Sequence, residues 1–156
     1  MVEMDRIDSE IVGLLQKNGR LSNKELAAEV GLAPSSCWER VQRLVAAGVF
    51  AGFHAEVDPR AMGVGLQAMV AVRLARHRRD RLDKFRREIL RLPEVVGLYH
   101  LAGRDDFLVH VAMRDADQLR EFLLARFTTR AEVTHLETHL IFDHVKNPVM
   151  PRYEPR

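Results

Sequence analysis

Six polar residues between positions 35 and 43 have side chains of the types that contact nucleic-acid bases. In the major groove, arginine pairs with the edge of guanine, glutamine with that of adenine, glutamate with the amino group of cytosine, and serine with several bases. The apolar residues among them recur at helical spacing, so a helix here turns these polar side chains outward. They are Ser35, Ser36, Glu39, Arg40, Gln42 and Arg43.

Local signals place another helix directly before this one. Ser22 and Glu25 have the spacing of a capping box, in which each side chain bonds the backbone N–H of the other residue. Gly31 supplies a left-handed turn, and Pro34 suits the first turn of the next helix. Residues 1–50 therefore predict a helix-turn-helix, although a helical hairpin with a merely solvated outer face is the alternative. In a helix-turn-helix, DNA phosphates meet the start of the middle helix at Ser22, Asn23 and Lys24.

A second candidate site is the segment Gly103-Arg104-Asp105-Asp106-Phe107. The glycine lets the backbone approach a ligand, and two adjacent carboxylates can bind an α-amino group. An ordinary hairpin turn is the alternative, which composition and spacing alone favour. Further residues that can contact the same ligand are His100 and Leu101 before the loop, and Thr134 and Thr138 on the last predicted strand.

His135, Glu137 and His139 alternate along that strand and share one of its faces. Two imidazoles and a carboxylate can bind a metal, with His110 or His144 as a further ligand. A solvated polar face explains the same pattern and is the interpretation we prefer, so we expect no metal. The sequence has no glycine-rich phosphate loop, nucleophile elbow or pair of catalytic carboxylates, and we therefore expect neither enzyme activity nor a cofactor.

Residues 65–145 predict the framework that carries the loop. Apolar residues that alternate, or that recur at helical spacing, indicate the order β-α-β-β-α-β of a ferredoxin-like α+β domain, with both helices on one sheet face. Several strands are apolar on both sides, so we expect a second subunit to cover the other face. The expected strands are 66–74, 95–102, 107–113 and 134–142, and the expected helices are 82–92 and 116–127.

Composition excludes several other classes of protein. The chain is 47% hydrophobic and 29% charged, and its longest stretch without a charge, 61–72, is too short to cross a membrane. The acidic, polar start is not that of a signal peptide. The single cysteine, Cys37, is expected in the core of a cytoplasmic protein. Net charge is only +2, and we interpret the basic stretch 76–91 as a solvated helix with a role in DNA wrapping or assembly.

Several short motifs follow one another along the chain: Asp5–Asp8, Gly19–Ser22, Glu25–Ala27, Val30–Val41, Arg43–Leu44, Gly48–Phe50 and the loop Gly103–Phe107. Together they resemble the Lrp/AsnC family of transcriptional regulators, over the whole chain up to Val145. The resemblance implies a winged helix-turn-helix DNA-binding domain and an ACT-like, effector-binding (RAM) domain. The boundaries that we expect are 1–52 for the first domain, 53–64 for a hinge strand and linker, 65–145 for the second domain and 146–156 for an irregular tail.

The resemblance also implies how such a protein works. Members of the family form dimers, often assembled into octamers, and respond to small effectors that are usually amino acids. The loop 103–107 then lies between dimers and lines the amino-acid site. We therefore interpret the chain as a cytoplasmic, homo-oligomeric, sequence-specific transcriptional regulator, without a membrane partner. An effector modulates its assembly or its binding to double-stranded DNA.

The expected recognition helix departs from the family at two positions. Glu39 and Gln42 stand where Arg or Lys is common, so each dimer is expected to bind DNA modestly and with a shallow salt dependence. Trp38 is expected to pack between helices. Two alternatives stay open, an architectural DNA-binding protein without an effector and a tetrapyrrole decarboxylase of the same architecture. The intact pattern 35–44 argues against the enzyme.

Overall fold

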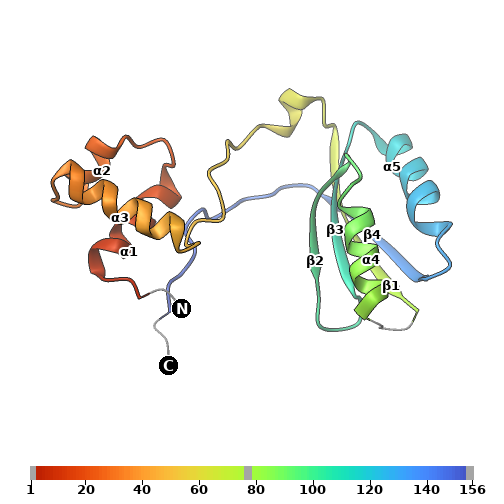
Figure 1. Ribbon diagram of the computed structural model, residues 1–156. Coiled ribbons are helices and arrows are strands. Elements are labelled where there is room, and N and C mark those ends of the chain that lie inside the picture. Colours follow the sequence, from red (N-terminus) through yellow and green to blue (C-terminus); the bar gives the residue numbers. More distant parts are fainter. Residues whose placement is uncertain (1–2, 76–78, 154–156) are drawn as a thin grey trace. The chain divides into compact units, whose positions relative to one another are not determined.

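The chain folds as two compact units, shown in Figure 1. The computed structural model describes residues 3–75 and 79–153, so residues 76–78 of the predicted basic stretch and 154–156 of the predicted tail lie outside the described part. One unit contains the residues up to Glu56 and the segment from Val145 onward, and the other runs from Val57 to His144. The chain therefore passes from one unit to the other twice.

Three helices build the first unit: α1 (Arg6–Lys17), α2 (Asn23–Glu29) and α3 (Pro34–Ala46). Each begins where its local sequence directs. The carboxylate of Asp5 accepts a backbone N–H of the first turn of α1, and Ser22 and Glu25 form the predicted capping box of α2. Gly31, with a φ of 66°, makes the left-handed turn before α3. The predicted helix-turn-helix is thus confirmed.

A small apolar core lies between these helices, made of Ile11, Leu15, Leu26, Ala27, Cys37 and Leu44. Cys37 is buried as predicted, and burial raises the pKa of its thiol. The prediction that Trp38 packs between helices is wrong, because 54% of it is exposed, and Val45 of the same helix is also exposed. Only the stripe through Cys37 and Leu44 faces the other helices, since the apolar face of a surface helix covers roughly 100° of its circumference.

The segment after α3 is extended and has no strand partner. Residues 3–65 contain no assigned β-strand, so the hinge strand expected within 53–64 is not formed in the single chain. A short 3₁₀ turn, η1 (Pro59–Met62), and Gly63, with a φ of 78°, lead into the second unit.

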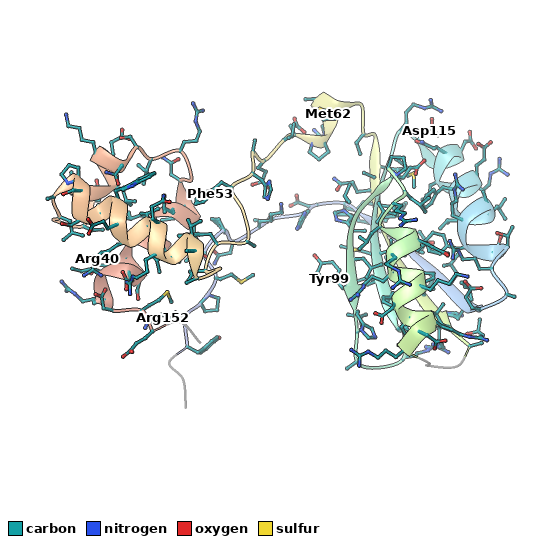
Figure 2. The ribbon with its side chains drawn as sticks, viewed as in Figure 1. Arg40, Phe53, Met62, Tyr99, Asp115 and Arg152 are labelled. Atoms are coloured by element: carbon teal, nitrogen blue, oxygen red, sulfur yellow. The ribbon has the colours of Figure 1, made fainter. Side chains whose placement is uncertain are left out.

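The C-terminal segment has no helix or strand among its described residues, and it lies against the first unit. The amide of Met150 donates to Gln16 Oε1 at 2.7 Å. The guanidinium of Arg152 donates to the carbonyl of Met4 at 2.8 Å and to the hydroxyl of Ser9. Figure 2 shows this arginine beside the beginning of the chain. Sequence patterns did not indicate this contact.

The second unit is a four-stranded antiparallel sheet with its helices on one face (Figure 1). The strand order β2-β3-β1-β4 is that of a ferredoxin-like domain, so the predicted fold is confirmed. The elements are β1 (Leu66–Leu74), α4 (Arg79–Ile89), β2 (Val95–His100), β3 (Phe107–Met113), α5 (Ala116–Leu123), the π-helical turn η2 (Leu124–Thr128) and β4 (Val133–Ile141). None of the helices in the described ranges is long and apolar enough to span a membrane.

The larger core fills the space between this sheet and its helices, and two aromatic residues show how helical phase shapes it. Phe122 and Phe127 are both buried, with ring centroids 5.7 Å apart, although they are five positions apart in sequence. The wide turn η2 makes this possible, since its hydrogen bonds span five residues. A regular α-helix over 116–127 would not place both phenylalanines on the same buried side. Phe142, expected in the last strand, instead follows its end and is 99% exposed.

The opposite face of the sheet is open and carries both apolar and polar side chains. Met69 pairs with His110 of β3 on one side and with His139 of β4 on the other. Tyr99 of β2 pairs with Leu108 and is exposed. Figure 2 shows Tyr99 on the side of the sheet away from α4 and α5. This open face is therefore mixed in character.

Candidate nucleic-acid interface and ligand loop

A cluster of two carboxylates and two guanidinium groups joins the start of α1 to α3, and we refer to Asp5, Asp8, Arg40 and Arg43 as the α3 anchor. Arg40 Nη1 donates to Asp8 Oδ1 at 2.8 Å and to Asp5 Oδ2 at 2.6 Å, and Arg43 Nη2 donates to Asp8 Oδ2. Asp8 is fully buried. Figure 2 shows Arg40 on α3, turned toward the first helix. The anchor therefore fixes how α3 packs on α1.

The electrostatics of the α3 anchor favour the charged forms of Asp5, Asp8 and Arg40. Burial raises the pKa of Asp8, but hydrogen bonds from Arg43, from Arg40 and from the Asp5 amide outweigh it and hold that pKa below its ordinary value. The pKa of Asp5 is lowered by the backbone N–H of Asp8 and by Arg40. The same carboxylates raise the pKa of Arg40.

The predicted DNA contacts on α3 divide into two groups. Ser35, Ser36, Glu39 and Gln42 are exposed on the outer side of the helix. The two arginines belong to the α3 anchor, and the side chain of Arg43 is 51% exposed whereas that of Arg40 is 29% exposed. A shallow groove of about 460 Å³ runs along this edge of α3, lined by Asp5, Ser36, Glu39, Arg40 and Arg43. The sequence predicted that both arginines point outward. Arg43 is exposed as predicted, whereas Arg40 is partly buried by its pairing with Asp5 and Asp8, which sequence patterns did not indicate.

The predicted phosphate contacts at the start of α2 also differ from one another. Ser22 donates from its backbone N–H and from its hydroxyl to the Glu25 carboxylate, at 2.8 and 2.7 Å, and these bonds lower the pKa of Glu25. Asn23 donates from Nδ2 to the carbonyl of Pro34 at 2.8 Å, which joins the starts of α2 and α3. Lys24 is exposed. Of these three residues, only Lys24 carries an exposed charge.

The predicted ligand loop is held against β1 by Arg73, a residue that sequence patterns did not single out. Arg73 Nε donates to the carbonyl of Arg104 at 2.8 Å, and Nη2 donates to Asp105 Oδ1 at 3.1 Å. Asp106 is buried, and its Oδ2 accepts the Leu74 amide at 2.7 Å. Both carboxylates of the loop therefore engage β1, and only long-range strand pairing brings Arg73 to them.

The remaining predicted ligand contacts lie at different distances from the loop along the strands. Gly103, with a φ of 145°, makes the turn of the loop, and Leu101 is exposed beside it. His100 stacks on the buried Phe107 with ring centroids 5.0 Å apart. The two predicted threonines differ, because the Thr134 hydroxyl donates to the Arg73 carbonyl at 3.1 Å, whereas Thr138 pairs with Val70 further along the sheet.

The polar stripe His135, Glu137 and His139 lies on the open face of the sheet. Glu137 is 3.9 Å from His135 Nε2 and 3.8 Å from His139 Nε2. His110 shares a hydrogen bond of 2.9 Å with Gln67, and its ring lies edge-on to His144 at 6.0 Å. Across the described residues, no three histidine, cysteine or acidic side chains are grouped closely enough to hold a metal ion.

A helix-turn-helix with a polar second helix, joined to a ferredoxin-like unit, defines a class of protein, the two-domain DNA-binding regulators. Residues 4–45 match the family model of the AsnC-type helix-turn-helix domain, and residues 67–150 match that of the Lrp/AsnC ligand binding domain. The chain belongs to the Lrp/AsnC family of transcriptional regulators, as its sequence motifs predicted. It is therefore a transcriptional regulator with a DNA-binding and a ligand-binding domain.

Relatives of known name or structure agree with this assignment. HTH-type transcriptional regulator AldR of Mycobacterium tuberculosis is 43% identical over 92% of this chain and 80% of its own length. The leucine-responsive regulatory protein of Escherichia coli is 32% identical over 92% of this chain and 88% of its own. The crystal structure of a transcriptional regulator from Neisseria meningitidis in complex with L-Met has a TM-score of 0.85 and 30% identity, with 93% and 94% of the two chains covered.

Proposed function

We propose that this protein is a cytoplasmic, homo-oligomeric regulator that binds specific double-stranded DNA through α3, and that an amino acid at the β2–β3 loop changes this binding. The observation that carries the proposal is the α3 anchor, in which the buried Asp8 holds two arginines and so presents a polar helix face at a set angle. The ligand-binding domain matched by residues 67–150 and the L-Met complex of the Neisseria meningitidis relative support an amino-acid effector.

The DNA contacts follow from exposure and chemistry. Exposed serine, glutamate and glutamine side chains of α3 meet base edges, and exposed cations meet phosphates. Arg40 acts as a positioning residue, because its guanidinium bonds two carboxylates. Base contacts are assigned to Ser35, Ser36, Glu39 and Gln42, and phosphate contacts to Lys24 and Arg43. So few cations give each dimer modest affinity and a shallow salt dependence.

The ligand loop offers a charge pair that complements an amino-acid zwitterion. Arg73 and Asp105 lie 3.1 Å apart, and both side chains are only partly buried. A bound amino acid places its carboxylate on the guanidinium and its ammonium on the aspartate, which replaces one ion pair by two. A Cβ on Gly103 would meet no atom within 4 Å, so the backbone beside this pair is open to a ligand.

A second copy of the chain is the proposed partner of the open sheet face. Met69, Leu108 and Tyr99 leave apolar surface on that face in the single chain, and a ferredoxin-like sheet with helices on one side only needs such cover. We propose a dimer, with an octamer as the larger assembly. Sedimentation at micromolar protein concentration measures which of these assemblies forms.

The proposal is tested by fluorescence anisotropy with DNA from upstream of the gene, at about 50 and about 200 mM salt. Each titration is run with and without a pool of the common amino acids. Glu39→Ala and Gln42→Ala are expected to weaken binding, and Glu121→Ala, an exposed glutamate of α5, is the matched control. The pair Arg40→Ala and Arg43→Ala is a poor test, since both side chains also hold α3 in place.

The outcomes separate the candidate functions. Saturable binding that the pool shifts supports the proposal, and dividing the pool then identifies the effector. Saturable binding that no amino acid shifts favours an architectural DNA-binding protein. The absence of binding at either salt concentration refutes the DNA-binding proposal, and a visible absorption change on adding a porphyrinoid then tests the tetrapyrrole decarboxylase.

A further inference from the structure

Trp38 is the only tryptophan of the chain, and about half of it is exposed on α3. A single exposed apolar side chain is common on protein surfaces and means little by itself. The position of this one is informative. Ser35, Trp38, Glu39 and Gln42 are spaced i, i+3, i+4 and i+7, so they form one continuous stripe along the helix.

The packing of α3 leaves little freedom in where this stripe points. Cys37 and Leu44 are fully buried against the other helices, and Arg40 turns toward α1 through the α3 anchor. The stripe occupies the side of the helix that remains, and Trp38 lies in its second turn. In a helix-turn-helix the first turns of the second helix contact base edges in the major groove. Trp38 therefore lies among the residues assigned above to base contacts.

The chemistry of the groove supplies a partner for an indole ring. Serine, glutamate and glutamine match hydrogen-bonding groups on bases, whereas the apolar feature of the major groove is the C5 methyl group of thymine. A protein partner is less suited to this stripe, because protein interfaces centre on contiguous apolar surface from which charged groups are depleted. Here the exposed ring has Ser35 and Glu39 as neighbours on the helix, and Val45, another exposed apolar side chain of α3, lies two turns further along, so the apolar surface is not contiguous.

We propose that Trp38 is a specificity-determining residue, and that its indole ring contacts a thymine methyl group and so selects A·T at one position of each half-site. The inference rests on the proposed DNA binding. It adds an apolar contact to a face that is otherwise polar, and the ring loses water when it enters the groove.

The test removes single methyl groups from DNA. Each thymidine of the bound upstream fragment is replaced in turn by deoxyuridine, which lacks only the C5 methyl. For the wild-type protein, one replacement per half-site is expected to weaken binding about fourfold, the effect of one buried methyl group. Trp38→Ala is expected to bind the unmodified DNA more weakly and to ignore that replacement. Trp38→Phe keeps an aromatic ring and is expected to retain part of the sensitivity.

Three further measurements accompany the scan. Val45→Ala removes another exposed apolar side chain of α3, two turns further along, and is expected to leave the deoxyuridine scan unchanged. The emission of Trp38 reports the indole directly, since no other tryptophan contributes. It is expected to be quenched by DNA with the same affinity as the anisotropy titration. Circular dichroism of each variant verifies that the helices remain folded.

Failure of this inference is distinct from failure of the proposed function. Wild-type protein that binds no DNA refutes the proposed function and the inference with it. Wild-type protein that binds DNA but tolerates every deoxyuridine refutes the inference alone. Equal sensitivity to the same replacement in wild type and Trp38→Ala also refutes it, because another residue then contacts that methyl. Loss of the dimer in Trp38→Ala, with an unchanged scan, assigns the side chain to a protein contact and overturns the proposal.

Discussion

Replacing Asp8 by alanine removes the carboxylate on which the α3 anchor depends. Asp8 accepts hydrogen bonds from Arg40 at 2.8 Å, from Arg43, and from the Asp5 amide at 3.1 Å, and it is fully buried. Removing one partner of a buried ion pair destabilises a protein by about 3–5 kcal/mol. The loss here is smaller, because the arginine side chains are 29% and 51% exposed and can be hydrated in the variant.

We therefore expect Asp8→Ala to lower the free energy of unfolding of the first unit by about 2–3 kcal/mol. Urea unfolding monitored by the emission of Trp38 measures this quantity, since the only tryptophan lies in that unit. With a denaturant slope of about 1 kcal/mol per molar urea, the midpoint falls by about 2–3 M. DNA affinity is expected to fall as well, under conditions in which the variant is still folded, because α3 loses its fixed angle.

The matched control is Glu10→Ala on the same helix. Glu10 pairs with Arg6 at 3.6 Å, and 45% of its side chain is exposed, so this change is expected to alter stability by less than about 0.5 kcal/mol. Asp8→Asn keeps one carbonyl oxygen as an acceptor and is expected to fall between the two. An Asp8→Ala midpoint as close to wild type as that of Glu10→Ala would refute the reasoning, because the anchor would then contribute nothing.

Further predictions concern pH, the ligand loop and backbone strain. The pKa of Asp8 is lowered in the folded state, so the ionised carboxylate contributes its full stability above the unfolded pKa of about 3.9. That stability is lost as pH falls through the folded pKa. The free energy of unfolding of Asp8→Asn is therefore expected to depend less on pH in this acid range than that of the wild type. Asp106→Ala leaves the Leu74 amide without its acceptor and is expected to cost about 1–3 kcal/mol in thermal unfolding of the second unit. Gly103→Ala and Gly13→Ala both have open space for a Cβ, but only Gly103 has a positive φ, of 145°. The first is expected to destabilise by about 1 kcal/mol or more, and the second, within α1, to stabilise by about 0.5–1 kcal/mol, as measured by calorimetry.

Much of the fold was predictable because it is encoded by neighbours in sequence. The capping pair Ser22 and Glu25 and the turn at Gly31 act within a few residues, so their geometry follows from local chemistry alone. Strict alternation likewise located β1 at Leu66–Leu74. The π-helical turn η2 was missed, since one wide turn shifts the phase of a helix without a distinct residue signal.

The candidate sites were less predictable, because their geometry depends on partners far away in sequence. Sequence reasoning found α3 and the β2–β3 loop by residue type, and the DNA and effector contacts within them remain predictions. It did not find that Asp8 binds Arg40, 32 positions later, or that Arg73 binds Asp105, also 32 positions later. It placed Trp38 inside the helix bundle, whereas half of the side chain is exposed.

The sequence by itself determined the order of elements, the helix-turn-helix, the ferredoxin-like unit and the family. The elements and the two folds follow from short-range hydrogen bonding and from the period of apolar residues, both of which act along the chain. The family follows from the resemblance of several short motifs to those of Lrp/AsnC regulators. Only the tertiary structure decided which arginines of α3 are held by carboxylates, how Arg73 ties the ligand loop to β1, and that Trp38 faces outward. The physical reason is that burial and ion pairing depend on which surfaces meet in space. The periodicity of a sequence indicates which face of a helix is apolar, but it does not determine how much of that face other elements cover.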